Sequence, residues 1–248
     1  MSAPALIALA HGSHDPRSAR TVGEIVTTTK RLRPDLHVEA AFLDHNGPDL
    51  RVVVDRMVEV GHTELTAVPL LLASAYHARA DVPAAVGLAQ ARHPGVGLRL
   101  AEVVGSDPSL LTALDQRLLG ALQSGHLFEP DALVLASAGS TDSRANATIS
   151  QLAQLWGEQH HLPASVAFSS AAPPSPAEAV REWRRKGRRR VAVGSLFIAP
   201  GRLPDRVKEL ALEAGAIAVT EPLGAHVQLS RLILARYSVG AATAGVLV

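Results

Sequence analysis

The chain has 248 residues, a formal net charge of +1 and no cysteine. The absence of cysteine excludes disulfides and thiolate metal sites, and the near-zero charge provides no long-range field that would attract nucleic acid. No apolar run approaches the roughly 18 residues of a membrane span, and the first residues lack a basic segment for export. We therefore expect a cytoplasmic protein that binds neither membranes nor nucleic acid.

Apolar runs of β type alternate with helical patterns along the first half of the chain. Helices are expected to begin near Ser18, Pro48, Val82 and Pro108. The strands expected before them cover Ala5–Ala10, His37–Phe42, Leu65–Leu72 and Gly97–Val103. This alternation is typical of βαβ units, in which the strands form a parallel sheet with helices on both faces.

The second half of the chain repeats the same count of elements. Its strands are expected near Ala132–Ala136, Ser165–Phe168, Arg190–Phe197 and Ile217–Thr220, and its helices near Ser143, Pro176, Leu203 and Ala225. The sequence therefore predicts an α/β protein of two tandem, similar domains, each with a four-stranded parallel sheet. We place the duplicated domains at residues 1–124 and 125–248, joined by a loop that contains Gly125 and Pro130.

Two strand-end loops show the duplication most clearly. "AHGSHDPR" after the first strand and "SAGSTDSR" after the fifth share a Gly-Ser turn, an aspartate and an arginine at matched positions. The match fails at His11, which faces Ala138 127 residues later. The second copy therefore keeps the loop but lacks its histidine.

Further polar residues follow the second and third strands of the first half. Asp44 and His45 come after the second strand, and His77 lies a few residues past the third. In the common strand order 2-1-3-4, the carboxyl ends of these strands meet at one edge, where ligands bind. A lone histidine there is more often a hydrogen-bonding loop residue, but imidazoles and a carboxylate together suit divalent Fe, Co, Ni or Zn.

These motifs are similar to those of a known family. The stretches "ALAHGSHDPRS", "FLDHNGPDL" and "VPLLLASAYHARADVP" resemble the class II chelatases, and more narrowly the two-domain sirohydrochlorin chelatases. The resemblance covers nearly the whole chain and implies two α/β domains that face each other across the cleft of the active site. It also implies that His11 and His77 handle the metal, with Asp44 where the family often has glutamate. Either Asp44 or His45 would take the place of that glutamate.

The chemistry implied by the resemblance is ATP-independent insertion of Fe²⁺ or Co²⁺ into sirohydrochlorin, with iron favoured and Ni²⁺ a further candidate. The metal is a substrate, and no permanently bound cofactor is expected. An imidazole can hold such an ion and can also accept a pyrrole proton near neutral pH. Because the macrocycle carries carboxylates, we expect donors that bind them. The candidates are Ser13, Arg17, His45, Ser140, Arg144 and Arg202. For the arginines, salt bridges within each domain are an equal alternative.

Two rival functions remain open from the sequence. A carrier of tetrapyrrole or metal would use the same ligands without catalysing insertion. A histidine phosphatase also begins with a strand that ends in His-Gly, but that class has an arginine where this chain has Ala10. The role of His14, in the same loop as His11, is left undecided. Because the fusion supplies both halves, a monomer is expected to suffice.

Overall fold

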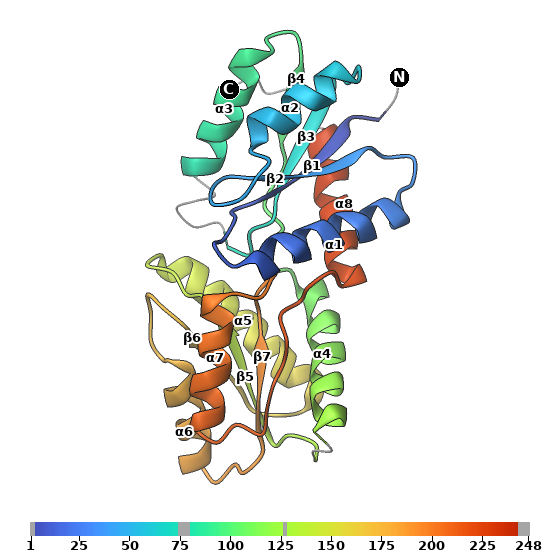
Figure 1. Cartoon of the computed structure of the whole chain (residues 1–248). Helices are drawn as coiled ribbons and strands as arrows, with labels where there is room; N and C mark the ends of the chain where they lie inside the picture. The colour runs from blue at the N-terminus through green and yellow to red at the C-terminus, as the bar shows by residue number, and fades with distance from the viewer. Residues whose placement is uncertain (1–2, 74–79, 126–127, 243–248) are drawn as a thin grey trace. The chain divides into compact units, whose positions relative to one another are not determined.

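The computed structural model describes residues 3–73, 80–125 and 128–242 (Figure 1). Contacts within the chain separate it into two compact units, one formed by residues 1–105 with 225–248 and the other by 106–224. Within the described residues, no helix is long and apolar enough to cross a membrane. The expected cleft between the domains stays a prediction.

The first unit contains a parallel sheet whose strands follow the predicted order. The strands pair in the order β2-β1-β3-β4, all parallel. Their bounds are Ala5–Ala10 for β1, Val38–Phe42 for β2, Glu64–Pro69 for β3 and Gly97–Leu100 for β4. The predicted third strand was too long, because its neighbour β1 ends at Ala10, opposite the residue that follows Pro69.

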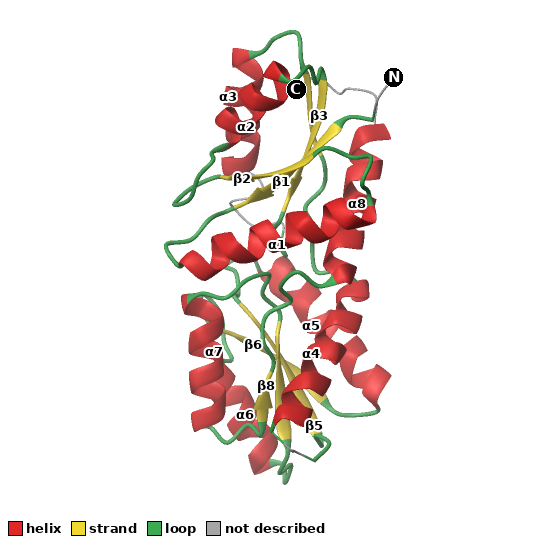
Figure 2. Cartoon of the chain, turned by 45° about the vertical axis from the view of Figure 1, so that its right-hand side comes forward, coloured by secondary structure: helices red, strands yellow, loops and turns green. Residues whose placement is uncertain are grey.

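Helices cover both faces of this sheet, as Figures 1 and 2 show. Leu50–Glu59 (α2) and Val82–Arg92 (α3) pack together on one face, and Pro16–Leu32 (α1) and Val227–Ala242 (α8) pack together on the other. Alternate residues of β1 point to the two faces, and Ala5, Ile7 and Leu9 belong to the core under α2 and α3. Every residue of β1 is buried, so this strand lies at the centre of the unit.

The second unit repeats this architecture. Its parallel strands pair in the order β6-β5-β7-β8. Their bounds are Ala132–Ser137 for β5, Ala164–Phe168 for β6, Val191–Ser195 for β7 and Ala218–Val219 for β8. Leu111–Ser124 (α4), after a 3₁₀ turn at Pro108–Leu110, and Ser143–His160 (α5) contact the sheet from one side. Pro176–Arg185 (α6) and Arg202–Glu213 (α7) pack together against it. The prediction of two four-stranded parallel sheets with helices on both faces is confirmed.

The packing units do not follow the order of the two sequence copies. Helix α8, at the end of the second copy, packs in the first unit, where the Tyr237 hydroxyl donates to the Pro4 carbonyl at 2.6 Å. Helix α4, at the end of the first copy, packs in the second unit, where the Asp115 carboxylate accepts from the Trp156 indole at 2.7 Å. Each copy therefore contributes its last helix to the other unit. The expected boundary at 124/125 concerns the duplication in sequence and stays a prediction.

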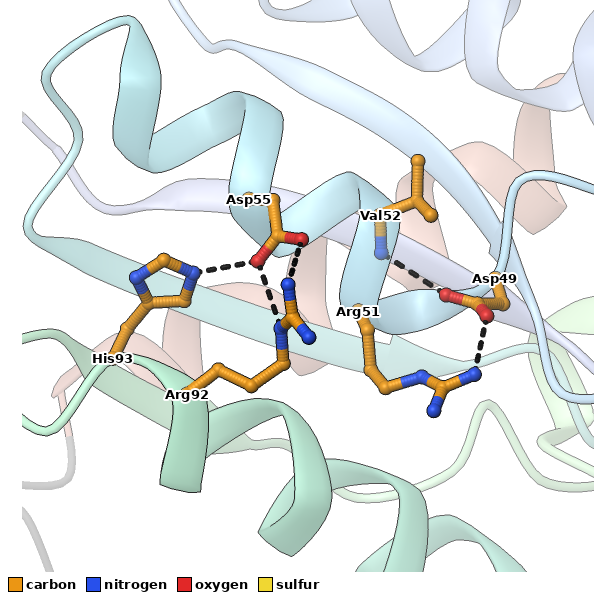
Figure 3. A network of polar contacts seen from close by, with 6 residues as sticks. All are labelled: Asp49, Arg51, Val52, Asp55, Arg92 and His93. Carbon is orange, nitrogen blue, oxygen red and sulfur yellow. Dashed lines mark hydrogen bonds and ion pairs between the residues drawn. The ribbon is translucent and has the colours of Figure 1, made fainter.

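Polar contacts join α2 to α3 on the outer face of the first unit (Figure 3). The Asp55 carboxylate on α2 pairs with the Arg92 guanidinium at 2.8 Å and with the His93 ring at 2.6 Å. The hydrogen bonds from Arg92 and then His93 hold the pKa of Asp55 below its usual value. Asp49 begins α2 by accepting from the backbone N–H of Val52 at 3.0 Å. This cluster fixes the helix that follows the Asp44–His45 loop.

Candidate functional site

The first rim is the carboxyl-end edge of the first sheet, formed by residues 11–17 after β1 and 43–48 after β2. These two loops are locked together by their backbones. The Asp44 N–H donates to the His11 carbonyl at 2.9 Å. Gly12 has a φ of +96°, and a Cβ at this position would overlap the Asp44 carbonyl oxygen. Glycine is therefore required where the two loops meet, and it brings His11 close to Asp44 and His45.

The polar residues after Gly12 build the turn into α1. The Ser13 hydroxyl accepts from the Asp15 N–H at 3.1 Å, and Asp15 caps α1 by accepting from the Arg17 N–H at 2.9 Å. The Arg17 side chain returns to the same carboxylate and holds the pKa of Asp15 below its usual value. Of the two roles expected for Arg17, the structure shows the salt bridge within the unit.

Three imidazoles lie in a row on the first rim. The ring centroids of His11 and His45 are 6.3 Å apart, at an interplanar angle of 79°, and those of His45 and His14 are 4.0 Å apart. The Asp44 carboxylate accepts from the backbone N–H of His45 at 2.7 Å. The same carboxylate lies 3.5 Å from the ring nitrogen Nε2 of His45. His45 adopts a left-handed φ of 62°. We call His14, His45 and His11 the histidine row.

His77, the fourth residue expected at this rim, lies outside the described residues, so its meeting with His11 stays a prediction. Within the described part of the chain, no three His, Asp or Glu side chains are placed so that they could share one metal ion. The arrangement that the structure does show is a set of neighbouring imidazoles with a carboxylate beside them. Such a set can bind a divalent ion weakly and can accept protons.

The second rim, residues 138–144 after β5 and 169–174 after β6, has the same backbone as the first. Gly139 has a φ of +85°, and a Cβ there would overlap the Ser170 carbonyl oxygen. The Ser140 hydroxyl accepts from the Asp142 N–H at 3.0 Å, and Asp142 caps α5 by accepting from the Arg144 N–H at 2.9 Å. Each of these contacts has its counterpart on the first rim.

The correspondence extends to a loop whose duplication the sequence analysis missed. Ala171, 126 residues after His45, has a φ of 60°, and the Phe168 N–H donates to Pro174 O as the Phe42 N–H donates to Pro48 O. The matched phenylalanines and prolines were the available signal. The rims therefore differ mainly in chemistry. Where the first rim has His11, His14, Asp44 and His45, the second has Ala138, Thr141, Ser170 and Ala171.

The second unit has an open pocket of about 720 Å³ beside this rim. Its lining residues are Ser169, Ser170, Arg202, Leu203, Asp205, Arg206 and Glu209. Arg202, a residue expected from the sequence, begins α7, and Arg206 lies one turn further along. Arg206 was not predicted from the sequence, although its spacing from Arg202 on a helix was a signal that the two side chains share a face. The hydroxyls of Ser169 and Ser170 donate to the Ala138 carbonyl, so the pocket can bind an anionic group through the two guanidinium groups.

Comparison with known proteins agrees with this picture of two related halves. The CbiX family model matches residues 5–121 and again residues 132–239. A sirohydrochlorin ferrochelatase of Priestia megaterium is 26% identical over 92% of this chain and 87% of its own length. A sirohydrochlorin cobaltochelatase of the same organism is 25% identical over 81% of this chain and 66% of its own length. Among solved structures, SirB from Bacillus subtilis with Fe³⁺ covers 97% of this chain and 96% of its own, with a TM-score of 0.80 and 22% identity, which is a likeness of fold.

Proposed function

The chain belongs to the CbiX family, and from this premise we propose that it is a chelatase that inserts a divalent metal ion into sirohydrochlorin without ATP. The observation that carries the proposal is the difference between the rims. Two loop pairs share glycine turns, helix caps and left-handed residues, yet only the first pair carries imidazoles beside a carboxylate. The relatives named for ferrochelatase and cobaltochelatase activity support the same reaction.

His11 and His77 guide the metal and accept pyrrole protons in this proposal. Insertion must strip water from the ion and remove two protons from the macrocycle, and a neutral imidazole can serve both steps. The Nδ1 atom of His11 is buried. That burial leaves Nε2 as the nitrogen of His11 best placed to meet an incoming ion.

Asp44 supports the imidazoles rather than binding the metal by itself. Its carboxylate accepts from the backbone N–H of His45 and lies 3.5 Å from the Nε2 atom of the His45 ring, so it orients that imidazole. Between the two residues that the sequence left as replacements for the family's glutamate, we assign the metal contact to His45 and the orienting contact to Asp44.

The second rim and its pocket hold carboxylates of the macrocycle. Ser140, Arg144 and Arg202 are the donors expected from the sequence. Arg144 lies in the first turn of α5, and Arg206 adds a second guanidinium to the pocket. Ser13 and Arg17 serve the turn into α1, so their contribution to substrate is secondary to that of the second unit. One carboxylate held by an arginine in a bidentate contact is worth about 1.5–3 kcal/mol.

The reaction can be tested by the absorbance change that accompanies metallation of sirohydrochlorin. We expect the protein to accelerate it with Fe²⁺ under anaerobic conditions and with Co²⁺, as a monomer and without added nucleotide. A carrier would bind the ion and the macrocycle but leave the rate at that of the uncatalysed solution reaction. Equal rates with and without protein, for both metals, would remove the chelatase proposal.

A further inference from the structure

The histidine row runs from solvent toward the buried end of β1. His14 is exposed, the His45 side chain is 32% exposed, and the Nδ1 atom of His11 is buried. Successive ring centroids lie 4.0 Å and 6.3 Å apart. Neighbouring imidazoles at these distances can bind one ion in turn after small rotations of exposed side chains, which occur within nanoseconds.

The fold does not require these imidazoles. On the second rim the same backbone carries Thr141 in place of His14 and Ala171 in place of His45, and Ala171 adopts the same left-handed φ as His45. Within the described residues, the His14 ring contacts the His45 ring. A purely structural role therefore leaves the pairing of His14 with His45 unexplained.

We propose that His14 and His45 form a docking site for the divalent metal ion, from which the ion passes to His11. The inference rests on the proposed function and adds to it a route of entry for the metal. Imidazole is a ligand of intermediate softness that suits Fe²⁺, Co²⁺ and Ni²⁺. Asp44 lies within 3.5 Å of the His45 ring and adds a negative charge that attracts the cation.

The small number of ligands fits a site from which metal must leave. Within the described residues, no three metal-binding side chains converge on one point, so two imidazoles and water would complete the coordination. Such an ion is held less tightly than in a closed three- or four-ligand site. It can therefore move on to His11.

Kinetics separate metal docking from the chemical step. His14→Thr and His45→Ala each install the residue of the second rim, whose backbone geometry shows that the loops accept them. We expect the apparent KM for Co²⁺ to rise roughly tenfold in either variant. In His14→Thr, kcat at saturating Co²⁺ and the KM for sirohydrochlorin should stay unchanged. In His45→Ala kcat should fall as well, because that variant also removes the metal contact assigned to the reaction. His161→Asn is the matched control, since His161 is an exposed, left-handed residue of the other unit. An unchanged KM for Co²⁺ in His14→Thr would overturn the proposal.

Binding of metal alone tests the docking site even if the protein proves not to be a chelatase. In a His11→Ala protein without tetrapyrrole, paramagnetic Co²⁺ should broaden the ring resonances of His14 and His45 at lower concentration than those of His161. Adding His14→Thr should raise the Co²⁺ concentration needed to broaden His45 by roughly tenfold. Broadening of His14 and His45 no earlier than His161 would show that no ion docks there.

Discussion

The two rims are built on one backbone and carry different chemistry. Gly12 and Gly139 make the same close approach to a neighbouring carbonyl, and Asp15 and Asp142 cap the following helices in the same way. His45 and Ala171 share a left-handed conformation. The glycines and caps are therefore needed wherever a parallel strand turns into a helix at this edge, whether or not a reaction takes place there.

This comparison separates the residues that the loop conformation requires from the residues that are expected to bind or react. A motif such as His-Gly-Ser-x-Asp mixes both kinds, and the second copy shows which members the fold alone demands. Glycine, serine and aspartate persist there without a histidine. The histidines are thus the members of the motif whose presence the fold leaves unexplained, and they are where chemistry is expected.

The largest effect is expected from replacing His11, the residue that most clearly distinguishes the first rim from the second. His11→Ala should slow metallation by about 100-fold or more, the usual scale for the loss of a positioned acid–base group. The reciprocal Ala138→His should not restore the rate in the His11→Ala protein, because Ser170 and Ala171 offer no carboxylate or imidazole beside it. Rates are followed by absorbance with Co²⁺. A normal rate in His11→Ala would move the active site away from the first rim.

Replacing either of the shared glycines should lower the stability of its own unit by a similar amount. Gly12→Ala and Gly139→Ala each force a left-handed residue against a carbonyl, which should lower the free energy of unfolding by about 1–3 kcal/mol. Both tryptophans, Trp156 and Trp183, lie in the second unit, so fluorescence reports that unit and far-ultraviolet circular dichroism reports both. Gly139→Ala should shift the fluorescence transition in urea. Gly12→Ala should shift the dichroism more than the fluorescence, and the reverse pattern would contradict the assignment of the loops to the units.

A smaller effect should mark the second rim as the place where substrate is held. Arg202→Ala should raise the KM for sirohydrochlorin roughly tenfold and leave kcat nearly intact, since it removes a charged hydrogen bond made equally in the ground and transition states. Arg188→Ala is the control, because this arginine precedes the amino end of β7, whereas the second rim lies at the carboxyl ends of the strands. A fall in kcat with unchanged KM would place Arg202 in the chemical step instead.

The smallest effect concerns the helix pair that supports the first rim. Asp55→Asn should lower the free energy of unfolding at pH 7 by about 0.5–1 kcal/mol, because the Asp55–Arg92 pair is partly exposed. The pKa of Asp55 is lower in the folded chain, so its stabilisation is present above the unfolded pKa of about 3.9 and is lost as the pH falls through the folded pKa. Urea titrations at pH 7 and pH 3 should therefore show a smaller difference between the variant and wild type at pH 3. A difference independent of pH would mean that packing, rather than charge, joins α2 to α3.

Helices α6 and α7 of the second unit correspond to α2 and α3, and they provide the reference for the pH dependence of unfolding. There the Arg184 guanidinium donates to the Gly215 carbonyl at 3.3 Å, without a carboxylate partner in this contact. We expect Arg184→Gln to change the stability of the second unit by a similar or smaller amount with no dependence on pH in the acid range. An acid-dependent loss in that variant would show that a carboxylate near α6 or α7 makes an equivalent contact.

Much of this protein was determined by its sequence alone. The alternation of apolar runs with helical patterns predicted both parallel sheets, because periodicity depends on local sequence. The strand order was expected from the common order of such sheets. This order also placed His11, Asp44 and His45 at one edge of the first sheet, since these residues follow the carboxyl ends of two neighbouring strands. The repeated Gly-Ser turn revealed the duplication for the same reason.

Only the tertiary structure decided what depends on contacts distant in the chain. The sequence carries no signal that α4 and α8 pack in the unit of the other copy. The pattern of apolar residues in an amphipathic helix is the same whichever sheet the helix covers. The match between the loops after β2 and β6 lies in backbone angles that His45 and Ala171 share despite different side chains. The pairing of His14 with His45 likewise arises because Gly12 lets two loops, more than 30 residues apart in sequence, come into direct contact.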